Sequence, residues 1–343
     1  MHRVESIVRG RELAETENKT SSGSPPRAGG ASAVPTASTP PLLHGYTIFL
    51  SVATFLLVVA GALVTSNDAG LSVPDWPTSF GSFRMPRMVG GVLYEHGHRM
   101  FAATVGLLTV IMAVWVWLKE SRRWVKWLAG AAVLAVIAQG ILGGITVLFY
   151  LPLFVSTGHA VLAQMFFCIV VTLAVTTQKD WRWDETKVEE LPVIPSLRQL
   201  AVLLTGMIFL QLILGALYRH HGIGILPHLI GAIVVAVLAL WIVVRIYSRF
   251  LKEDRITRPA RGLLALVTAQ IFLGVVAYVL QLQFRGAPQP MPPLVRVGTA
   301  HVAVGALVLA QSLVLTLQVF RRVAAPNGSS AVGRVASGEN AQP

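Results

Sequence analysis

Eight long apolar segments run through this chain, and they constrain its fold more than any other feature of the sequence. Each is about 20 residues long, enough to cross roughly 30 Å of hydrocarbon as an α-helix. They lie near residues 46–65, 98–118, 127–149, 158–177, 199–217, 227–248, 262–281 and 298–319. Of the 343 residues, 54% are hydrophobic and only 13% are charged, which excludes an ordinary soluble domain. The sequence therefore predicts an all-α integral membrane protein with eight transmembrane helices.

Positive charge alternates between the linkers that join these segments. The linkers rich in Lys and Arg are 119–126, 178–198 and 245–261, and the linkers poor in them are 150–157, 218–226 and 282–297. Because cytoplasmic loops carry the excess of Lys and Arg, we expect the basic linkers and both termini on the cytoplasmic side. The net charge of +12 follows from this bias. With no soluble domain to carry that charge, we expect no nucleic-acid partner.

Composition also divides the chain into regions. Residues 1–41 and 323–343 are rich in Ser, Pro, Gly and Ala, a composition that cannot bury a core, so we expect disordered cytoplasmic tails. Between them we expect an N-terminal four-helix bundle over 42–178, a cytoplasmic linker over 179–198 and a C-terminal four-helix bundle over 199–322. The single cysteine, Cys168, excludes an intramolecular disulfide.

Every second apolar segment opens with a histidine. These are His98, His159, His228 and His301. Imidazole is costly in hydrocarbon without a partner, so four at one depth indicate a shared function. Two histidines facing each other across a bundle can hold a haem iron from both sides. We expect His98 to face His159, and His228 to face His301, as axial iron ligands.

A repeat underlies these histidines. The pattern Q-x-x-L-G occurs at 139–143, 211–215 and 270–274, and each copy is followed by a loop and a histidine-led segment; Gly61 marks a weaker fourth copy. Four helices per unit make this a parallel repeat of two four-helix bundles. We interpret the Gln–Gly pattern as close helix packing rather than chemistry. The alternative for the histidines is hydrogen bonding between helices, which their common register disfavours.

The two halves differ in one carboxylate and one loop. Glu95 lies three residues before His98, on the same helix face, and loop 66–97 is rich in Gly, Pro and Trp. We interpret Glu95 as a catalytic group and the loop as an ordered cap, the alternative for Glu95 being a structural partner of the ligand or of the helix dipole. Arg84, Arg87 and Arg296 are candidates to hold haem propionates or are simply solvated charges.

Taken together, these residues resemble the haem A synthase family. The resemblance rests on GALVTSNDAGLSVPDWPTSFG after the first segment, on Glu95-x-x-His98-Arg99, and on His159, His228 and His301, and it covers about 46–319. It implies oxidation of the C8 methyl group of haem O to the formyl group of haem A, by two hydroxylations with oxygen from water. It also implies haem b between His228 and His301, haem O between His98 and His159, and Glu95 acting on the substrate methyl.

The resemblance further implies a setting and exposes a departure. We expect a multi-pass protein of the bacterial inner membrane, with its histidines near the outer face. Its partners would be lipid, the farnesyltransferase that makes haem O and an unidentified electron acceptor, with homo-oligomerisation left open. Many family members carry a cysteine pair flanking Pro-Asp-Trp-Pro, where this chain has Val73 and Ser79. A disulfide or thiol role for that loop is therefore excluded here.

Two other functions deserve comparison. A di-haem electron carrier of the cytochrome b type needs the same histidine pairs but neither Glu95 nor a capping loop, and its haems usually lie at two depths. A transporter with a parallel repeat predicts ionisable residues near the helix midplanes. The helix centres here hold Gln but essentially no Asp, Glu, Lys or Arg. Both features favour the synthase.

Overall fold

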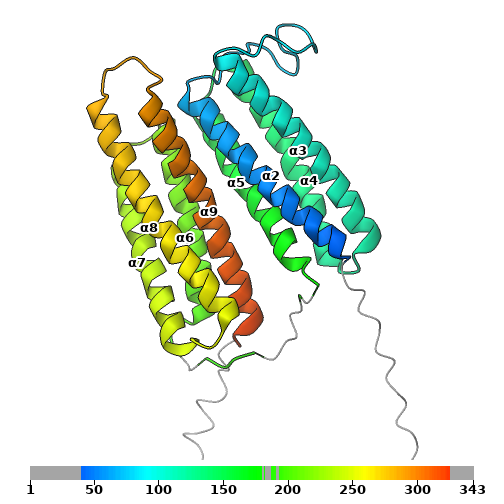
Figure 1. The fold of residues 1–343 in the computed structure, drawn as a ribbon, viewed down its shortest axis with the longest axis vertical. Helices are drawn as coiled ribbons and strands as arrows, with labels where there is room; N and C mark the ends of the chain where they lie inside the picture. The colour runs from blue at the N-terminus through cyan, green and yellow to red at the C-terminus, as the bar shows by residue number, and fades with distance from the viewer. Residues whose placement is uncertain (1–39, 180, 182–186, 191–192, 325–343) are drawn as a thin grey trace, which may run out of the picture. The chain divides into compact units, whose positions relative to one another are not determined.

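The fold is entirely helical across the part of the chain that the computed structural model describes, residues 40–179, 181, 187–190 and 193–324 (Figure 1). Its helices are α2 (Pro41–Ser66), α3 (Gly91–Lys119), α4 (Arg123–Leu148), α5 (Leu153–Thr176), α6 (Leu197–Arg219), α7 (Leu226–Arg249), α8 (Asp254–Gln283) and α9 (Pro292–Arg322). All eight are long and apolar enough to cross a membrane, which confirms the predicted number of spans. Residues 1–39 and 325–343, most of the predicted tails, lie outside the described residues.

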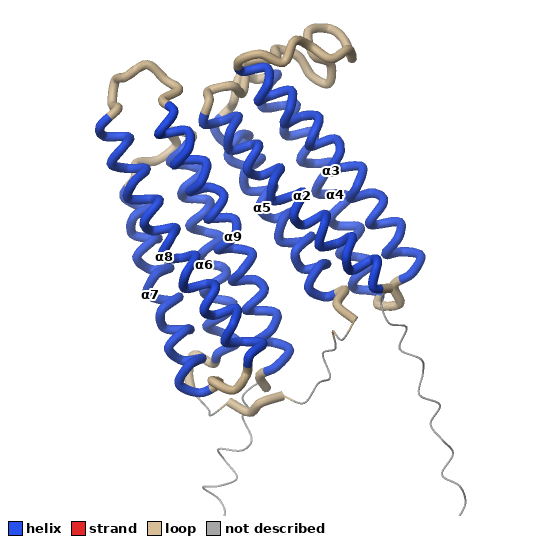
Figure 2. The backbone as a smooth tube through the Cα atoms, in the orientation of Figure 1, coloured by secondary structure: helices blue, strands red, loops and turns tan. Residues whose placement is uncertain are grey.

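The helices pack in two groups of four, and the longest connection within a group is loop 67–90 between α2 and α3 (Figure 2). Helices α2, α3, α4 and α5 contact one another in a ring, and α6, α7, α8 and α9 repeat the same scheme of contacts. We call these groups the N-terminal bundle and the C-terminal bundle. In both, each helix packs against its neighbours in the chain, and the first helix also packs against the fourth.

Every helix is longer than the apolar segment that predicted it. α3 begins at Gly91 rather than near 98, and α9 begins at Pro292 rather than near 298. Hydropathy marks the part of a helix that suits hydrocarbon, whereas the helix itself continues into polar sequence. The four histidines consequently lie within the first three turns of α3, α5, α7 and α9 instead of opening them. His96 and Arg296, which the sequence placed in outer loops, are also helical.

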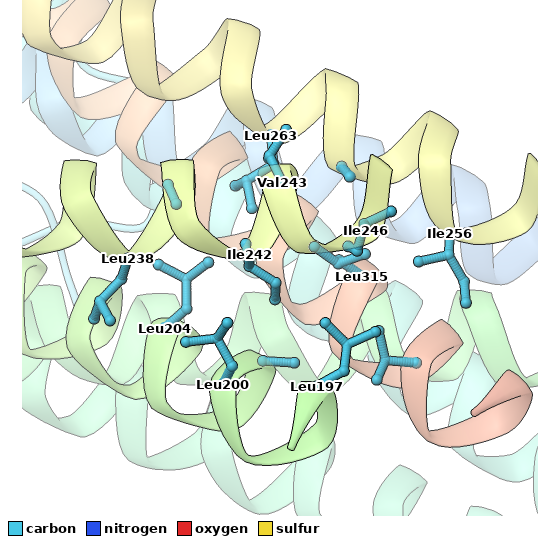
Figure 3. Packing of buried hydrophobic residues seen from close by; sticks show 14 of the residues in the cluster. Leu197, Leu200, Leu204, Leu238, Ile242, Val243, Ile246, Ile256, Leu263 and Leu315 are labelled. Atoms are coloured by element: carbon cyan, nitrogen blue, oxygen red, sulfur yellow. The ribbon is translucent and has the colours of Figure 1, made fainter. Parts of the chain in front are cut away.

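The C-terminal bundle has a continuous apolar core toward the end where α6 begins. Its fully buried side chains come from all four helices and interdigitate in layers (Figure 3). The core includes Leu197, Leu204, Ile242, Leu263 and Leu315. Association of helices in lipid depends on such close packing because lipid tails are as apolar as the side chains. The core thus fixes the register of the helices that carry the histidines.

The two bundles meet along α2 and α5 on one side and α6 and α9 on the other. Phe167 and Val171 of α5 form an apolar cluster with Ala306 of α9. A polar contact adds to it: Arg219 Nη2, at the end of α6, donates to Ser66 Oγ of α2 at 2.7 Å. Thr299 of α9 donates to the same hydroxyl at 3.1 Å. One hydroxyl of the N-terminal bundle therefore holds two helices of the C-terminal bundle.

The linker before α6 is attached to the opposite end of the C-terminal bundle. Val188 pairs with Val323 in an isolated parallel bridge, and its carbonyl accepts from Ala324 N at 2.9 Å. Glu190 accepts from Leu197 N and forms an ion pair of 2.7 Å with Arg245. Val323 and Ala324, part of the predicted C-terminal tail, thus have defined partners. Residues 180, 182–186 and 191–192 of the predicted linker lie outside the described residues.

Candidate haem-binding site

Each of the four histidine rings packs against a glycine on the preceding helix. A Cβ added to the glycine would lie about 3 Å from the ring Cε1 atom in every case. The distances are 3.2 Å for Gly61 and His98, 3.3 Å for Gly143 and His159, 2.9 Å for Gly215 and His228, and 3.0 Å for Gly274 and His301. A side chain at any of these positions would displace the ring. The predicted Gln–Gly pattern is therefore close packing, as expected, but its contact partner is the histidine.

The histidines form two pairs, one in each bundle. The ring centres of His228 and His301 are 6.2 Å apart, with their planes at 74°. Two imidazoles that share one metal ion have their centres about 6 Å apart, because each metal–nitrogen bond is about 2 Å. His98 and His159 lie on α3 and α5 of the N-terminal bundle, with their rings against Gly61 of α2 and Gly143 of α4. The structure thus brings His228 and His301 together as predicted and places His98 and His159 in one bundle.

Several buried polar atoms in these pairs have no hydrogen bond within the described part of the chain. They include Nδ1 of His98, His159 and His301. A buried imidazole nitrogen without a partner is costly, so such atoms indicate a missing ligand. No cluster of three or more His, Cys, Asp or Glu side chains suited to a bare metal ion occurs among the described residues. Paired imidazoles without further ligands fit a haem iron, whose other ligands come from the porphyrin.

Glu95 is buried and both of its carboxylate oxygens are engaged. Oε1 accepts from Arg99 Nη2 at 2.6 Å in an i,i+4 ion pair, and Oε2 accepts from Val73 N at 2.8 Å. Glu95 is therefore held from two directions: Arg99 comes from the same helix, α3, and the Val73 amide comes from the loop. The carboxylate therefore has a fixed orientation one helical turn from His98.

Arg99 holds the loop between α2 and α3. It donates to the carbonyl of Val73 at 3.1 Å, of Asp75 at 2.7 Å and of Thr78 at 3.3 Å. These contacts join the two ends of the segment Val73–Ser79. At its second end, Ser79 Oγ hydrogen-bonds His96 Nδ1 at 2.9 Å. A charged side chain and a hydroxyl thus fasten the loop to α3.

The same loop docks on the bundle through its tryptophan. A Cβ on Gly144 would lie 2.6 Å from Trp76 Cδ2, so the indole ring lies directly over the α4 backbone. Gly144 directly follows Gly143, the glycine against which the His159 ring packs. The neighbouring Asp75 carboxylate accepts from Thr78 and from the amides of Gly81 and Phe80. The Thr78 hydroxyl is the largest cause that holds the pKa of Asp75 below its usual value, and the Gly81 amide adds to it.

The predicted propionate arginines lie in two places. Arg84 and Arg87 are exposed and line an open hollow of about 520 Å³ within the loop, and Arg296 is exposed on α9. None of the three forms an ion pair within the described ranges. A further cation, Arg219, was not predicted to matter; it lies between the bundles and donates to Ser66 of α2. The sequence feature that could have pointed to it is its position as the one Lys or Arg in linker 218–226.

Comparison with known proteins places this architecture in a family. A family model described as cytochrome oxidase assembly protein matches residues 85–227, which include Glu95, His98 and His159. A haem A synthase of Symbiobacterium thermophilum is 32% identical over 250 residues, 64% of this chain and 80% of that protein. The chain belongs to the haem A synthase family. This confirms the resemblance inferred from the sequence.

Other members of the haem A synthase family match shorter stretches. The protein of Lysinibacillus sphaericus is 29% identical over 181 residues, 52% of this chain and 58% of that protein. That of Alkalihalophilus pseudofirmus is 31% identical over 140 residues, 40% of this chain and 47% of that protein. The family model begins within the capping loop and ends one residue before His228, so it includes Glu95, His98 and His159 but neither α2 nor the histidines of the C-terminal bundle.

Proposed function

We propose that this chain is a haem A synthase that oxidises the C8 methyl group of haem O to the formyl group of haem A. Membership of the family supports this activity, as does the match to a relative named for it over most of that relative's length. The observation that carries the proposal is the repeated packing of a histidine ring on glycine, which occurs once on each side of both candidate haem sites.

The proposal assigns a different haem to each pair. His228 and His301 hold haem b, and their ring separation of 6.2 Å supports a shared iron. His98 and His159 hold the substrate haem O, next to Glu95. Bound haem b would supply one-electron redox chemistry, accepting electrons taken from the substrate. Arg84, Arg87 and Arg296 are included as weaker contacts for propionates.

Within the N-terminal bundle the protein residues position the substrate and manage its charge. The histidines and their glycines fix the depth and tilt of haem O. Oxidation of the methyl group develops positive charge on carbon, which a fixed carboxylate stabilises. Glu95 is held for this by Arg99 and Val73, and it can then accept a proton from the attacking water. Loop 67–90 limits access of bulk water.

The arrangement in the membrane belongs to the same proposal. We propose a parallel repeat of the two bundles with both termini cytoplasmic, supported by the basic linkers and by the recurring helix contacts. The histidine pairs then lie near the outer face of a bacterial inner membrane. The partners are lipid, the farnesyltransferase that supplies haem O and an electron acceptor.

One experiment separates this function from that of a cytochrome b type carrier. Full-length protein would be purified from cells that make haem O, its haems extracted and separated by chromatography, and its total haem content measured by pyridine haemochrome spectra. We expect haem b together with haem O or haem A. Haem b alone in both bundles, with no haem A formed on addition of haem O and an oxidant, would overturn the proposal in favour of the carrier.

A further inference from the structure

Three of the four histidines are accompanied by a glutamine on the preceding helix. Gln139, Gln211 and Gln270 each stand four residues, about one turn, before the glycine on which the ring packs. In α2 the corresponding position, four residues before Gly61, is Leu57. The fourfold repeat is thus broken at His98 alone.

The glutamines do not contact their histidines in the same way. Gln211 Nε2 lies 3.0 Å from His228 Nδ1 and 2.7 Å from the His228 carbonyl. Gln270 Nε2 lies 3.2 Å from His301 Nε2. Gln139 Nε2 reaches only the carbonyl of His159, at 2.9 Å. Both rings of the C-terminal pair are therefore contacted at a ring nitrogen, which leaves Nε2 of His228 and Nδ1 of His301 for a metal.

The rings of the N-terminal pair have no such support in the described part of the chain. Among the described residues no side chain or amide hydrogen-bonds either ring nitrogen of His98 or His159, so whichever nitrogen binds a metal, the other has no partner. The residues at the corresponding sequence positions of the N-terminal bundle are apolar, since Leu57 and Phe101 pack against its hydrophobic core. Phe101 stands three residues after His98, as Gly231 does after His228.

That glycine makes room for the amide in the C-terminal bundle. A Cβ on Gly231 would lie 2.1 Å from Gln211 Oε1, and a Cβ on Gly305 would lie 3.1 Å from Gln270 Nε2. The space for the two glutamines is therefore built into α7 and α9. A side chain at either glycine would collide with the group that holds the ring.

A hydrogen bond to the non-ligating nitrogen of a histidine fixes the ring and strengthens the ligand, and its loss typically weakens metal affinity 10- to 100-fold. A glutamine amide has both a donor and an acceptor. After rotation of the amide, its NH2 group can donate to an unprotonated ring nitrogen or its oxygen can accept from a protonated one. The C-terminal pair thus combines two oriented ligands. The N-terminal pair combines two ligands oriented by packing alone.

We infer that Gln211 and Gln270 are positioning residues that make the C-terminal pair a permanent haem site, and that Leu57 at the matching place beside His98 keeps the N-terminal pair exchangeable. An exchangeable site suits a haem that arrives as substrate and leaves as product. The inference rests on the proposed function, because it takes the haem of each pair from that proposal.

The test measures how fast haem b leaves the purified full-length protein, using apomyoglobin as the acceptor. Gln211→Met and Gln270→Met remove the amide at nearly constant volume, and we expect haem b to leave about 10- to 100-fold faster. Gln211→Glu retains an acceptor and should release haem b at the wild-type rate while lowering its midpoint potential. Gln139→Met is the matched control, with an unchanged release rate of haem b.

The outcomes separate the inference from the proposed function. Release from Gln211→Met and Gln270→Met at the wild-type rate, or equal acceleration by Gln211→Met and Gln211→Glu, overturns the inference. Retention of haem b by both His228→Ala and His301→Ala instead overturns the assignment of haem b to the C-terminal pair, which belongs to the proposed function.

A gain-of-function variant adds a second readout. Leu57→Gln with Phe101→Gly should slow release of haem O or haem A from the N-terminal pair. An unchanged release rate in a folded variant counts against the inference.

Discussion

The two bundles share a backbone plan and differ in a handful of contacts around equivalent histidines. In both, ring and glycine meet at about the same distance. The N-terminal bundle adds a buried Glu95–Arg99 pair and a docked loop, whereas the C-terminal bundle adds two glutamines at its rings. The difference teaches that one helical scaffold can place equivalent histidines in two different surroundings, which the proposed function assigns to a substrate site and a permanent haem site.

The largest expected effect tests the separation of the two sites. His228→Ala and His301→Ala should lose nearly all haem b absorbance, because one remaining imidazole does not hold a low-spin iron from both sides. His98→Ala, the matched change in the other bundle, should keep its haem b. Absorbance and pyridine haemochrome spectra of purified variants provide the measurement. Equal loss in all three variants would show that the bundles do not bind haem separately.

The next effect concerns the carboxylate found in only one half. Glu95→Gln keeps size and hydrogen bonding but removes the charge, and haem A formation should fall about 10²- to 10⁴-fold with accumulation of haem O or a hydroxylated product. Haem b should be retained. Glu120, a buried glutamate at the other end of α3, is the control, and Glu120→Gln should form haem A normally. Normal haem A output from Glu95→Gln would leave that residue a purely structural role.

A third effect tests whether loop 67–90 docks on the N-terminal bundle through Trp76. Gly144→Ala places a methyl group inside the van der Waals radius of Trp76 and should destabilise the docked loop by about 1–3 kcal/mol. Gly140→Ala, one turn earlier on α4 with nothing within 4 Å, should be neutral or stabilise the helix by up to about 1 kcal/mol. Limited proteolysis of loop 67–90 reports the effect. Equal cleavage of the two variants would contradict the docking, and haem b spectra should be unchanged in both.

Acidification should affect the two halves at different pH. Burial first, and then Arg219 and His221, hold the pKa of His220 below 6.5, while hydrogen bonds hold that of Asp75 below 3.8. Both groups bind fewer protons when folded, so each contribution to stability is complete above the unfolded pKa and declines as pH falls below it. At pH 5.5, hydrogen exchange corrected for intrinsic rates should increase at the turn after α6 but not at Asp75–Gly81. His220→Gln should abolish the increase; its persistence would assign the effect to another group.

The smallest effect concerns the exposed arginines. Replacing Arg84, Arg87 and Arg296 together by Gln should accelerate release of bound haem by only about two- to fivefold, because exposed ion pairs contribute about 0–1 kcal/mol. Transfer to apomyoglobin measures this rate. A change of a hundredfold or more would show that these charges are buried against the propionates.

Features set by local composition could be predicted from the sequence. The eight spans follow from apolar runs long enough to cross hydrocarbon, and the histidine pairs follow from their spacing in the repeat. Helix ends were predicted too short because α3 and α9 continue through polar residues such as Glu95 and Arg296, which hydropathy does not assign to a helix. His96 was misplaced in a loop for the same reason.

Contacts between distant segments could not be predicted. Nothing in the segment Pro74–Pro77 indicates that Trp76 meets Gly144, and nothing near Arg219 indicates that it reaches Ser66 on another bundle. The glutamines were visible as a repeat, but their reach to His228 and His301 depends on the rotation of each helix about its axis. That rotation is fixed by packing of whole helices, which no local pattern encodes.

The common position of the four histidines also has an electrical consequence. They lie in the first turns of α3, α5, α7 and α9, which all begin at the same end of the helices (Figure 1). Moving one charge across a membrane costs about 2.3 kcal/mol per 100 mV, whereas moving it parallel to the plane costs nothing. Under the proposed function, electron transfer between haems held by the two pairs would therefore do no work against the membrane potential. In vesicles, collapsing that potential should leave this transfer at its original rate.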